Sequence, residues 1–270
     1  GGYAGISVSD ERVYTMDRQV EPGETERVIC CQAGTGRILW THSYPVSYGK
    51  LEYGSGPRAA PTVHRGRVYT LGALGDLFCL DARTGHQLFR CSLQKRFAGR
   101  LPTWGYAASP LVIGRTVIVQ PGGLNGRSVV ALDARDGRSL WQSLSDKAAY
   151  ATPLVIDVAG HPLLVIWTPS HVRGLDPATG KSLWAIPYKV TMGVAIASPA
   201  ISGNLLLVSG YWEGTRAIRL SPDGRTARLA WSENRFLRGF MSQPLLKAGH
   251  AYMLDKQYGV SCFELATGRK

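Results

Sequence analysis

The sequence contains no long hydrophobic run, and this absence excludes an ordinary membrane-spanning helix. Its densest apolar stretch, Leu163 to Trp167, is five residues long, whereas a transmembrane helix needs about 18 consecutive apolar residues. No secretory signal opens the chain at Gly1, which leaves the compartment open. Hydrophobic residues still make up 44% of the chain, so a substantial core can form and wholesale disorder is excluded.

Charged residues are also few, at 19%, and the acidic ones are the scarcer: 19 Asp and Glu stand against 31 Lys and Arg, a net charge of +12. Such an excess suits an anionic partner such as nucleic acid, lipid head groups or acidic glycan. The bases are scattered singly, however, and the densest cluster is Lys95, Arg96 and Arg100. Because no run of five or more bases exists, the sequence does not favour nucleic-acid binding.

Motifs for familiar catalytic and metal sites are missing as well. The six histidines show no His-Glu-x-x-His pairing, and there is no Gly-x-Ser-x-Gly elbow, Walker loop or Cys-x-x-Cys. Five cysteines are too few for a disulfide scaffold in a chain of this length. We therefore nominate no catalytic residue and no metal ligand, and we favour a protein that is not an enzyme.

The sequence does contain an internal repeat, in which one unit recurs about six times. Prolines in similar surroundings stand at positions 61, 110, 153, 199 and 244, spaced 49, 43, 46 and 45 residues apart. Each proline segment leads into further β-rich runs, and no helical period of 3.6 residues persists. The 32 glycines and 15 prolines indicate many turns. Four short strands repeated at this spacing predict an all-β fold, a β-propeller of four-stranded antiparallel blades.

The repeat predicts a single propeller domain over residues 1–270 with about six visible blades. We place the blades approximately at residues 1–44, 57–93, 106–144, 149–188, 194–233 and 238–270, the last one incomplete. Gly1 falls within the first strand of the first unit, and Lys270 stops two residues before the aromatic expected near position 272. We expect a fragment of a seven- or eight-bladed propeller. A six-bladed ring with a three-stranded final blade is the alternative.

A turn motif follows the third strand of most units. In its clearest copies an Asp is followed four residues later by a Gly; the Asp can bond the turn backbone, and the Gly accepts a positive φ. In several units an aromatic residue stands four positions past the turn glycine, where it can pack between neighbouring sheets. The predicted structural residues of these motifs are Asp81, Asp133, Asp176, Gly85, Gly137, Gly180, Trp40, Trp141 and Trp184.

These blades resemble the pyrroloquinoline-quinone (PQQ) type of β-propeller repeat, whose signature is Asp-x-x-Thr-Gly-Lys-x-x-Trp. The segment from Asp176 to Trp184 matches every fixed position of that signature. The resemblance covers essentially all of the chain and is specific for the fold. The repeat is shared by quinoprotein dehydrogenases, by the BamB-type outer-membrane assembly factor and by uncharacterised bacterial PQQ-like proteins. Residues 100–110 and 119–123 look closest to the last group.

The resemblance implies a binding or scaffold module of a bacterium, placed in the periplasm or otherwise outside the cytoplasm, with no cofactor expected. The alternative is a PQQ-dependent alcohol or sugar dehydrogenase, which would need a catalytic Asp and a calcium held by Glu and Asn beside the quinone. No local motif of this sequence matches that set. A second alternative is an extracytoplasmic sensor of glycan or another small ligand. We expect any membrane association to come through parts outside this chain.

Three cysteines, Cys30, Cys79 and Cys262, stand at equivalent positions of the repeat, where other copies have alanine or glycine. This pattern predicts a small, buried strand position, and free cysteine behaves there as a small hydrophobe. The adjacent pair Cys30-Cys31 is not predicted to be a disulfide, because neighbouring strand residues point to opposite faces. We expect all five cysteines to be free thiols.

Aromatic and arginine residues gather in the predicted connections between blades, at residues 44–57, 96–106 and 231–241, the last including Phe236 and Phe240. Successive connections emerge on one face of a propeller, and this composition is typical of binding surfaces. The alternative is that the aromatics seal the ends of blades. The predicted binding face for a protein, small-molecule or glycan ligand consists of Arg100, Trp104, Tyr106 and Arg238.

Overall fold

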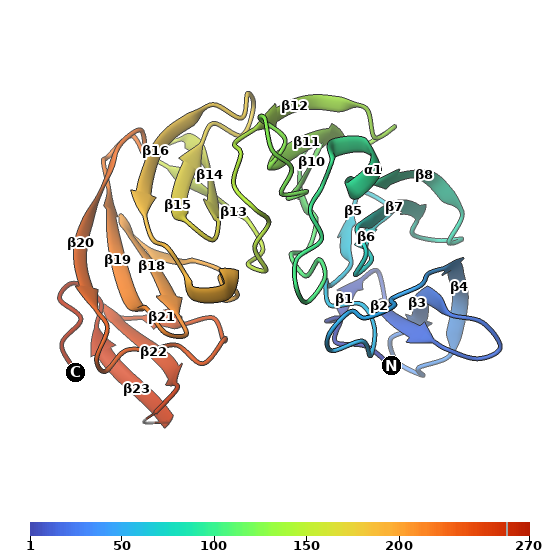
Figure 1. Ribbon diagram of the computed structural model, residues 1–270, viewed down its shortest axis with the longest axis horizontal. Coiled ribbons are helices and arrows are strands. Elements are labelled where there is room, and N and C mark those ends of the chain that lie inside the picture. Colours follow the sequence, from blue (N-terminus) through green and yellow to red (C-terminus); the bar gives the residue numbers. More distant parts are fainter. Residues whose placement is uncertain (258) are drawn as a thin grey trace. The chain divides into compact units, whose positions relative to one another are not determined.

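The structure, a computed structural model, describes residues 1–257 and 259–270. These residues form six antiparallel sheets, five of four strands and one of three (Figure 1). The described helical segments are short: α1 (Leu93–Phe97) and the 3-10 turn η1 (Thr191–Gly193). The predicted all-β fold is therefore confirmed. By internal contacts the chain divides into two compact units, Gly1–Ala148 and Ala149–Lys270, which are described separately.

The first unit contains three four-stranded sheets, each hydrogen-bonded in chain order. Sheet 1 consists of β1 (Ser7–Ser9), β2 (Arg12–Gln19), β3 (Thr25–Gln32) and β4 (Ile38–Pro45). Sheet 2 consists of β5 (Thr62–His64), β6 (Arg67–Leu71), β7 (Asp76–Asp81) and β8 (Gln87–Ser92). Sheet 3 consists of β9 (Leu111–Ile113), β10 (Thr116–Val119), β11 (Val129–Asp133) and β12 (Ser139–Ser143).

The second unit contains the other three sheets. Sheet 4 consists of β13 (Leu154–Val158), β14 (His161–Trp167), β15 (His171–Leu175) and β16 (Ser182–Pro187). Sheet 5 consists of β17 (Ala200–Ser202), β18 (Leu205–Gly210), β19 (Gly214–Leu220) and β20 (Ala227–Glu233). Sheet 6 has three strands, β21 (Leu245–Lys247), β22 (His250–Asp255) and β23 (Gly259–Glu264).

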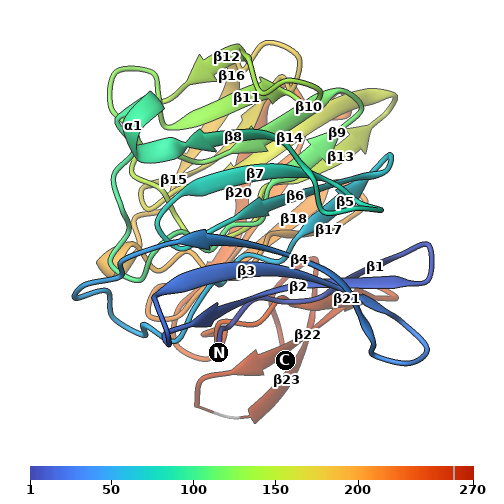
Figure 2. The same cartoon turned by 90° about the vertical axis from the view of Figure 1, so that its right-hand side faces the viewer.

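The core of each unit lies between consecutive sheets. In the first unit, Tyr14 and Cys30 of sheet 1 share an apolar cluster with Phe78 and Leu80 of sheet 2, and Figure 2 shows these two sheets side by side. The opposite face of sheet 2 packs on sheet 3 in the same way. In the second unit the same arrangement joins sheet 4 to sheet 5 and sheet 5 to sheet 6. Because side chains along a strand point alternately to the two faces of a sheet, a sheet that packs between two others can bury both of its faces.

A bulge in the fourth strand recurs in all five four-stranded sheets, and beside it an aromatic residue of that strand faces a small residue of the third strand. The register pairs are Cys30 with Trp40, Cys79 with Phe89, Ala131 with Trp141, Gly174 with Trp184, and Ala217 with Trp231. At Gly174 the crowding is severe, because an added Cβ would lie 2.2 Å from Cε2 of Trp184. The ring therefore explains why the repeat carries only cysteine, alanine or glycine here.

The same aromatic residue also contacts the following sheet. The indole Nε1–H of Trp40 donates to the carbonyl of Ala82 at 3.1 Å, and that of Trp184 donates to Gly224 at 3.0 Å. The turn glycine Gly85, at φ 74°, lies under the Trp40 ring, where an added Cβ would approach to 2.6 Å. One side chain thus joins two sheets by packing and by a hydrogen bond.

The turn carboxylates bond their own hairpins. Oδ1 of Asp81 accepts hydrogen bonds from the backbone N–H of Arg83 at 3.0 Å, and from the N–H and the hydroxyl of Thr84, both at 2.8 Å. Asp176 accepts from the hydroxyl of Thr179 at 2.9 Å in the same arrangement. The bonds from the Thr84 hydroxyl and N–H hold the pKa of Asp81 below its usual value. These carboxylates belong to separate sheets and stabilise turns.

The cysteines are free among the described residues, as predicted, and Cys30 and Cys79 are buried. The prediction that Cys262 is buried was wrong, because its side chain is exposed. Cys30 and Cys79 each face an aromatic residue of a fourth strand. Beside β23, by contrast, the described part of the chain places no fourth strand, so Cys262 faces solvent.

Candidate functional site

Each sheet has two kinds of end. In an antiparallel sheet of four strands, the connection to the next sheet and the turn between the second and third strands lie at one end, here called the connection side. The other two turns lie at the opposite end, the hairpin side. Hydrogen bonds reflect this arrangement: the N–H of Tyr106, in the connection after sheet 2, donates to the carbonyl of Ala73, in the turn between β6 and β7, at 2.8 Å.

Tyr106, one of the four residues of the predicted binding face, is not a surface residue. Its side chain is 2% exposed and belongs to the core between sheets 2 and 3. Its hydroxyl donates to the carbonyl of Pro121 at 2.9 Å, and burial raises its pKa. Tyr106 therefore packs inside the protein, as in the alternative in which the aromatic residues of the connections seal the ends of blades.

Arg100 and Trp104 lie on the connection side of the first unit. Arg100 is exposed and Trp104 is half-buried. The indole Nε1–H of Trp104 donates to Oε2 of Glu52 at 2.8 Å, and this bond ties the connection after sheet 2 to the connection after sheet 1. Tyr53 and Leu101 of the same two connections are exposed, at 67% and 40%. These connections therefore present apolar groups together with a guanidinium.

Arg238 lies in the second unit, in the connection between sheets 5 and 6. Its side chain is half-buried, and its Nε donates to the carbonyl of Asn234 at 2.9 Å. Its backbone N–H donates to Oδ2 of Asp255 at 3.1 Å. The four predicted residues are thus divided between the two units, and Arg238 braces its own loop.

The connection side of the second unit carries an aromatic cluster, defined here as Tyr211, Trp212, Phe240 and Lys256. The rings of Tyr211 and Trp212 meet edge to face with centroids 4.6 Å apart, and Phe240 lies 6.0 Å from Tyr211. The ammonium of Lys256 stands 3.9 Å from the Tyr211 centroid and 5.5 Å from that of Trp212. Trp212 and Phe240 are nevertheless 38% and 48% exposed. The cluster is an internally packed group of rings that keeps solvent-facing area.

Backbone bonds hold the loops of this cluster in place. The N–H of Phe240 donates to the carbonyl of Leu254, and that of Lys256 donates to the carbonyl of Arg238, both at 2.7 Å. The N–H of Gly239 donates to Oγ of Ser209 at 2.9 Å, and an added Cβ at Gly239 would lie 2.6 Å from that oxygen. The connection therefore lies directly against strands β18 and β22. Its rings are presented by fixed backbone rather than by a free loop.

Sequence reasoning identified the connection that contains Phe240 but missed Tyr211, Trp212 and Lys256. The signal that could have found them is positional. Tyr211 and Trp212 directly follow β18, in the turn to β19, and such turns share the connection side with the loops between sheets.

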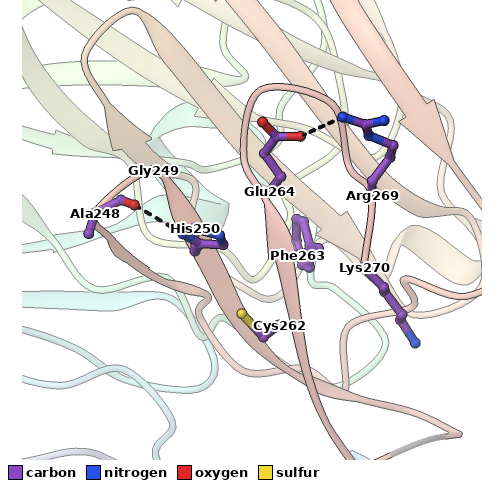
Figure 3. Close-up of a pocket in the computed structure, with 8 residues that line it drawn as sticks. All are labelled: Ala248, Gly249, His250, Cys262, Phe263, Glu264, Arg269 and Lys270. Carbon is purple, nitrogen blue, oxygen red and sulfur yellow. Dashed lines mark hydrogen bonds and ion pairs between the residues drawn. The ribbon is translucent and has the colours of Figure 1, made fainter.

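A hollow of about 680 Å³ lies on sheet 6 (Figure 3). Among its lining residues, Glu264 pairs with Arg269 at 3.5 Å (Figure 3). The hydroxyl of Thr267 also donates to Glu264 at 2.6 Å, and these two partners hold the pKa of Glu264 below its usual value. The hollow includes Cys262, which lies on β23, an edge strand of the three-stranded sheet. We ascribe it to the three-stranded sheet and assign it no ligand.

The described residues were also searched for clustered metal-ligand side chains. Across residues 1–257 and 259–270, no three His, Cys, Asp or Glu side chains come together where they could hold a metal ion. In the same residues no helix has the length and apolar character needed to cross a membrane.

Comparisons with known proteins agree on the fold. A family model described as outer membrane protein assembly factor BamB matches residues 24–270. The crystal structure of BamB from Moraxella catarrhalis is similar with a TM-score of 0.73 at 18% identity, over 98% of this chain and 74% of that one. A search of curated proteins found no match.

Two further structures show how widely the fold is used. A europium-containing methanol dehydrogenase has a TM-score of 0.62 at 15% identity, over 95% of this chain and 53% of that chain. The β-propeller domain of Cps50 (Swd1) from Myceliophteria thermophila has a TM-score of 0.56 at 12% identity, over 100% and 85% of the two chains. At such low identities the likeness concerns the fold alone. The six sheets are blades of a β-propeller, and the predicted fold class is confirmed.

Proposed function

Since the chain belongs to the family of outer membrane protein assembly factor BamB, we propose that it is a non-enzymatic β-propeller that binds a protein partner outside the cytoplasm. The family description supports both the scaffold role and the location. The observation that carries the proposal is the aromatic cluster on the connection side of the second unit. Clustered exposed aromatics mark interaction surfaces, whereas single exposed apolar residues are ordinary.

The composition of the cluster suits a protein partner. Tyrosine and tryptophan are the residues most enriched among those that dominate binding energy at protein interfaces. The rings of Tyr211, Trp212 and Phe240 already pack on one another, so little side-chain entropy is lost when a partner covers them. The ammonium of Lys256 adds a donor beside this apolar area, where it can bond a carboxylate or a backbone carbonyl of the partner.

Further exposed apolar residues extend this surface on the same connection. Phe236 and Met241 are 50% and 44% exposed. Oε2 of Glu233 accepts the N–H groups of Phe236 and Leu237 at 2.7 and 2.9 Å, which fixes the start of the connection. In the first unit we propose Arg100 and Trp104 as contacts of the same kind. Tyr106 is left out because it is buried.

The proposal is tested with paired variants in the native host. Trp212→Ala combined with Phe240→Ala removes the exposed rings of the cluster. The matched control, Leu140→Ala combined with Leu229→Ala, removes apolar groups of similar exposure, 40% and 44%, from the fourth strands β12 and β20. Both pairs are expressed as the full-length protein, and the co-purified partner is identified and quantified by mass spectrometry.

We expect the cluster variant to retain less than about one tenth of the partner, because each such anchor contributes about 2 kcal/mol and about 1.4 kcal/mol is tenfold in affinity. The control should retain it. A photoreactive amino acid at position 212 should also cross-link to that partner, whereas one at position 229 should not. Equal retention by both variants would overturn the proposal. Alcohol-driven dye reduction on adding PQQ and Ca²⁺ would favour the dehydrogenase instead.

A further inference from the structure

A small hollow on the hairpin side of the first unit is lined mostly by basic side chains. It lies between sheets 2 and 3, has a volume of about 110 Å³, and is lined by His64, Arg65, Arg67, Arg115 and Arg135 together with Tyr69. This volume is that of a few water molecules, and a single phosphate group fits the same scale. The lining residues belong to three hairpins, β5–β6, β9–β10 and β11–β12, so the hollow depends on the packing of both sheets.

The floor of the hollow is fixed by bonds to backbone carbonyls. Nη1 of Arg67 donates to the carbonyls of Ala134 and Arg135, at 3.1 and 2.8 Å. The hydroxyl of Tyr69 donates to the same Ala134 carbonyl at 2.8 Å. Because carbonyls carry no net charge, these bonds orient the guanidinium of Arg67 without neutralising it. In the described part of the chain Arg67 has no carboxylate partner within ion-pair distance.

The rim brings two turn tips together. Nε2 of His64 lies 3.1 Å from the carbonyl of Gly114, and this contact joins the β5–β6 turn to the β9–β10 turn. Arg65 and Arg115 stand at these tips and are both exposed. Among residues 1–257 and 259–270 the Arg65 guanidinium has no hydrogen-bond or ion-pair partner. Its five N–H donors are therefore available for a ligand.

Acidic residues near the hollow neutralise it only in part. Arg115 lies 3.8 Å from Oδ2 of Asp133, and Arg135 lies 3.5 Å from Oδ2 of Asp136. Oδ1 of Asp133 is already engaged by the backbone N–H of Arg135 at 2.8 Å. Four guanidinium groups thus face two carboxylates, and the balance around the hollow is positive.

The neighbouring junction shows that the fold does not require this charge. Between sheets 1 and 2 the same framework recurs: Nη1 of Arg12 donates to the carbonyl of Arg83 at 2.9 Å, and the hydroxyl of Tyr14 donates to Ala82 at 3.1 Å. Strand register places Asp10 where sheet 2 has Arg65. An acidic residue is therefore compatible with the turn. The hydrogen bonds that join neighbouring sheets explain why an arginine stands at position 67. They do not explain the arginine at position 65.

We infer that the hollow between sheets 2 and 3 binds a phosphate group, carried by a soluble phosphorylated molecule or by a lipid headgroup. Guanidinium groups recognise phosphate oxygens with paired, charge-assisted hydrogen bonds. Arg65 and Arg115 would bind the oxygens from the rim, and Arg67 would bind from the floor. This site is on the hairpin side of the first unit and is separate from the aromatic cluster, so the two proposals succeed or fail independently.

Two probes distinguish the sources of the phosphate. Inorganic phosphate is titrated at low salt and followed by NMR through the side-chain signals of the lining arginines. Vesicles of phosphatidylcholine with and without phosphatidic acid are tested by co-sedimentation. Saturable phosphate binding, or sedimentation that depends on phosphatidic acid, supports the site and identifies the source. If neither probe binds, the inference is wrong.

Variants then test whether binding occurs at this hollow. Arg65→Ala combined with Arg115→Ala should weaken binding of the responding probe at least tenfold, because both rim guanidinium groups are lost. The control, Arg37→Ala combined with Arg83→Ala, removes the same charge from exposed hairpin-side positions of sheets 1 and 2, and should weaken it less than twofold. Arg65→Asp, which copies the residue of the neighbouring junction, should abolish binding and keep the circular dichroism spectrum. Equal losses in the first two variants would show general charge attraction and overturn the site.

Discussion

The crowding between Gly174 and Trp184 leads to a prediction about their coupling. Gly174 faces Trp184 in the register of sheet 4, and an added Cβ would lie 2.2 Å from the ring. Replacing Gly174 by alanine must therefore displace the indole, which is 7% exposed and bonded to Gly224 at 3.0 Å. Overpacking of this kind costs about 1–3 kcal/mol. We expect Gly174→Ala to destabilise the second unit by an amount in this range.

Removing the ring should remove that penalty. Trp184→Ala alone is expected to cost about 3–5 kcal/mol, as for other buried aromatics cut to alanine. Once the indole is absent, the methyl group at position 174 has space. In the Trp184→Ala background, Gly174→Ala should therefore cost less than about 0.5 kcal/mol, and the two changes should be coupled by about 1 kcal/mol or more.

The wild type, the two single variants and the double variant form a double-mutant cycle. Urea unfolding followed by far-UV circular dichroism measures the free energy of unfolding of all four proteins. Because the chain has two compact units, the comparison uses the transition that Trp184→Ala shifts. Gly34→Ala serves as the control: no atom lies within 4 Å of its added Cβ and its φ is not positive, so its free energy of unfolding should change by less than about 0.5 kcal/mol. Additive effects of the two changes would show that the ring does not set the residue size at position 174.

Other predictions concern thiols, a turn and a buried hydroxyl. Alkylation without reductant should modify five cysteines after denaturation, and in native protein Cys262 should react before Cys30, because burial raises the pKa of the Cys30 thiol. Thr84→Val should raise the pKa of Asp81 in an NMR titration, since the Thr84 hydroxyl helps to lower it; the stability that this turn gains from ionised Asp81 is present above a pH of about 4 and is lost as pH falls through the lowered pKa. Tyr106→Phe should cost about 1 kcal/mol in urea unfolding and leave partner capture unchanged, because the hydroxyl bonds only within the core; loss of the partner would contradict its assignment as a core residue.

The blade unit could be predicted because its constraints are local and repeated. An Asp that bonds its own turn, a glycine with positive φ and a small residue under an aromatic ring all lie within about a dozen residues, and they recur in the same order. In the structure Asp81 bonds its own turn, Gly85 has a positive φ, and Gly174 lies under an aromatic ring. The proline spacing marks where each new sheet begins. The fold class follows from these features without knowledge of distant contacts.

The surface could not be predicted so well, because burial depends on what lies beside a residue in space. Tyr106 has the composition of a binding residue, but its connection runs over the core of sheets 2 and 3, which buries it. Cys262 has the position of a core residue, but the described residues place no strand beside β23. Tyr211 and Trp212 need Phe240 and Lys256, which lie farther along the chain, to form a cluster. None of these neighbours is visible in the repeat itself.

The strand order has a consequence for how the chain acquires its structure during synthesis. Every sheet pairs strands in chain order, such as β5 with β6, β6 with β7 and β7 with β8, so no strand waits for a distant partner. Short loop closures cost little entropy and favour fast folding. Sheet 2 can complete its hydrogen bonds once Ser92 has left the ribosome, and it then presents an apolar face to the sheet that follows. Within each unit, a completed sheet can therefore offer its apolar face to the next sheet that is synthesised.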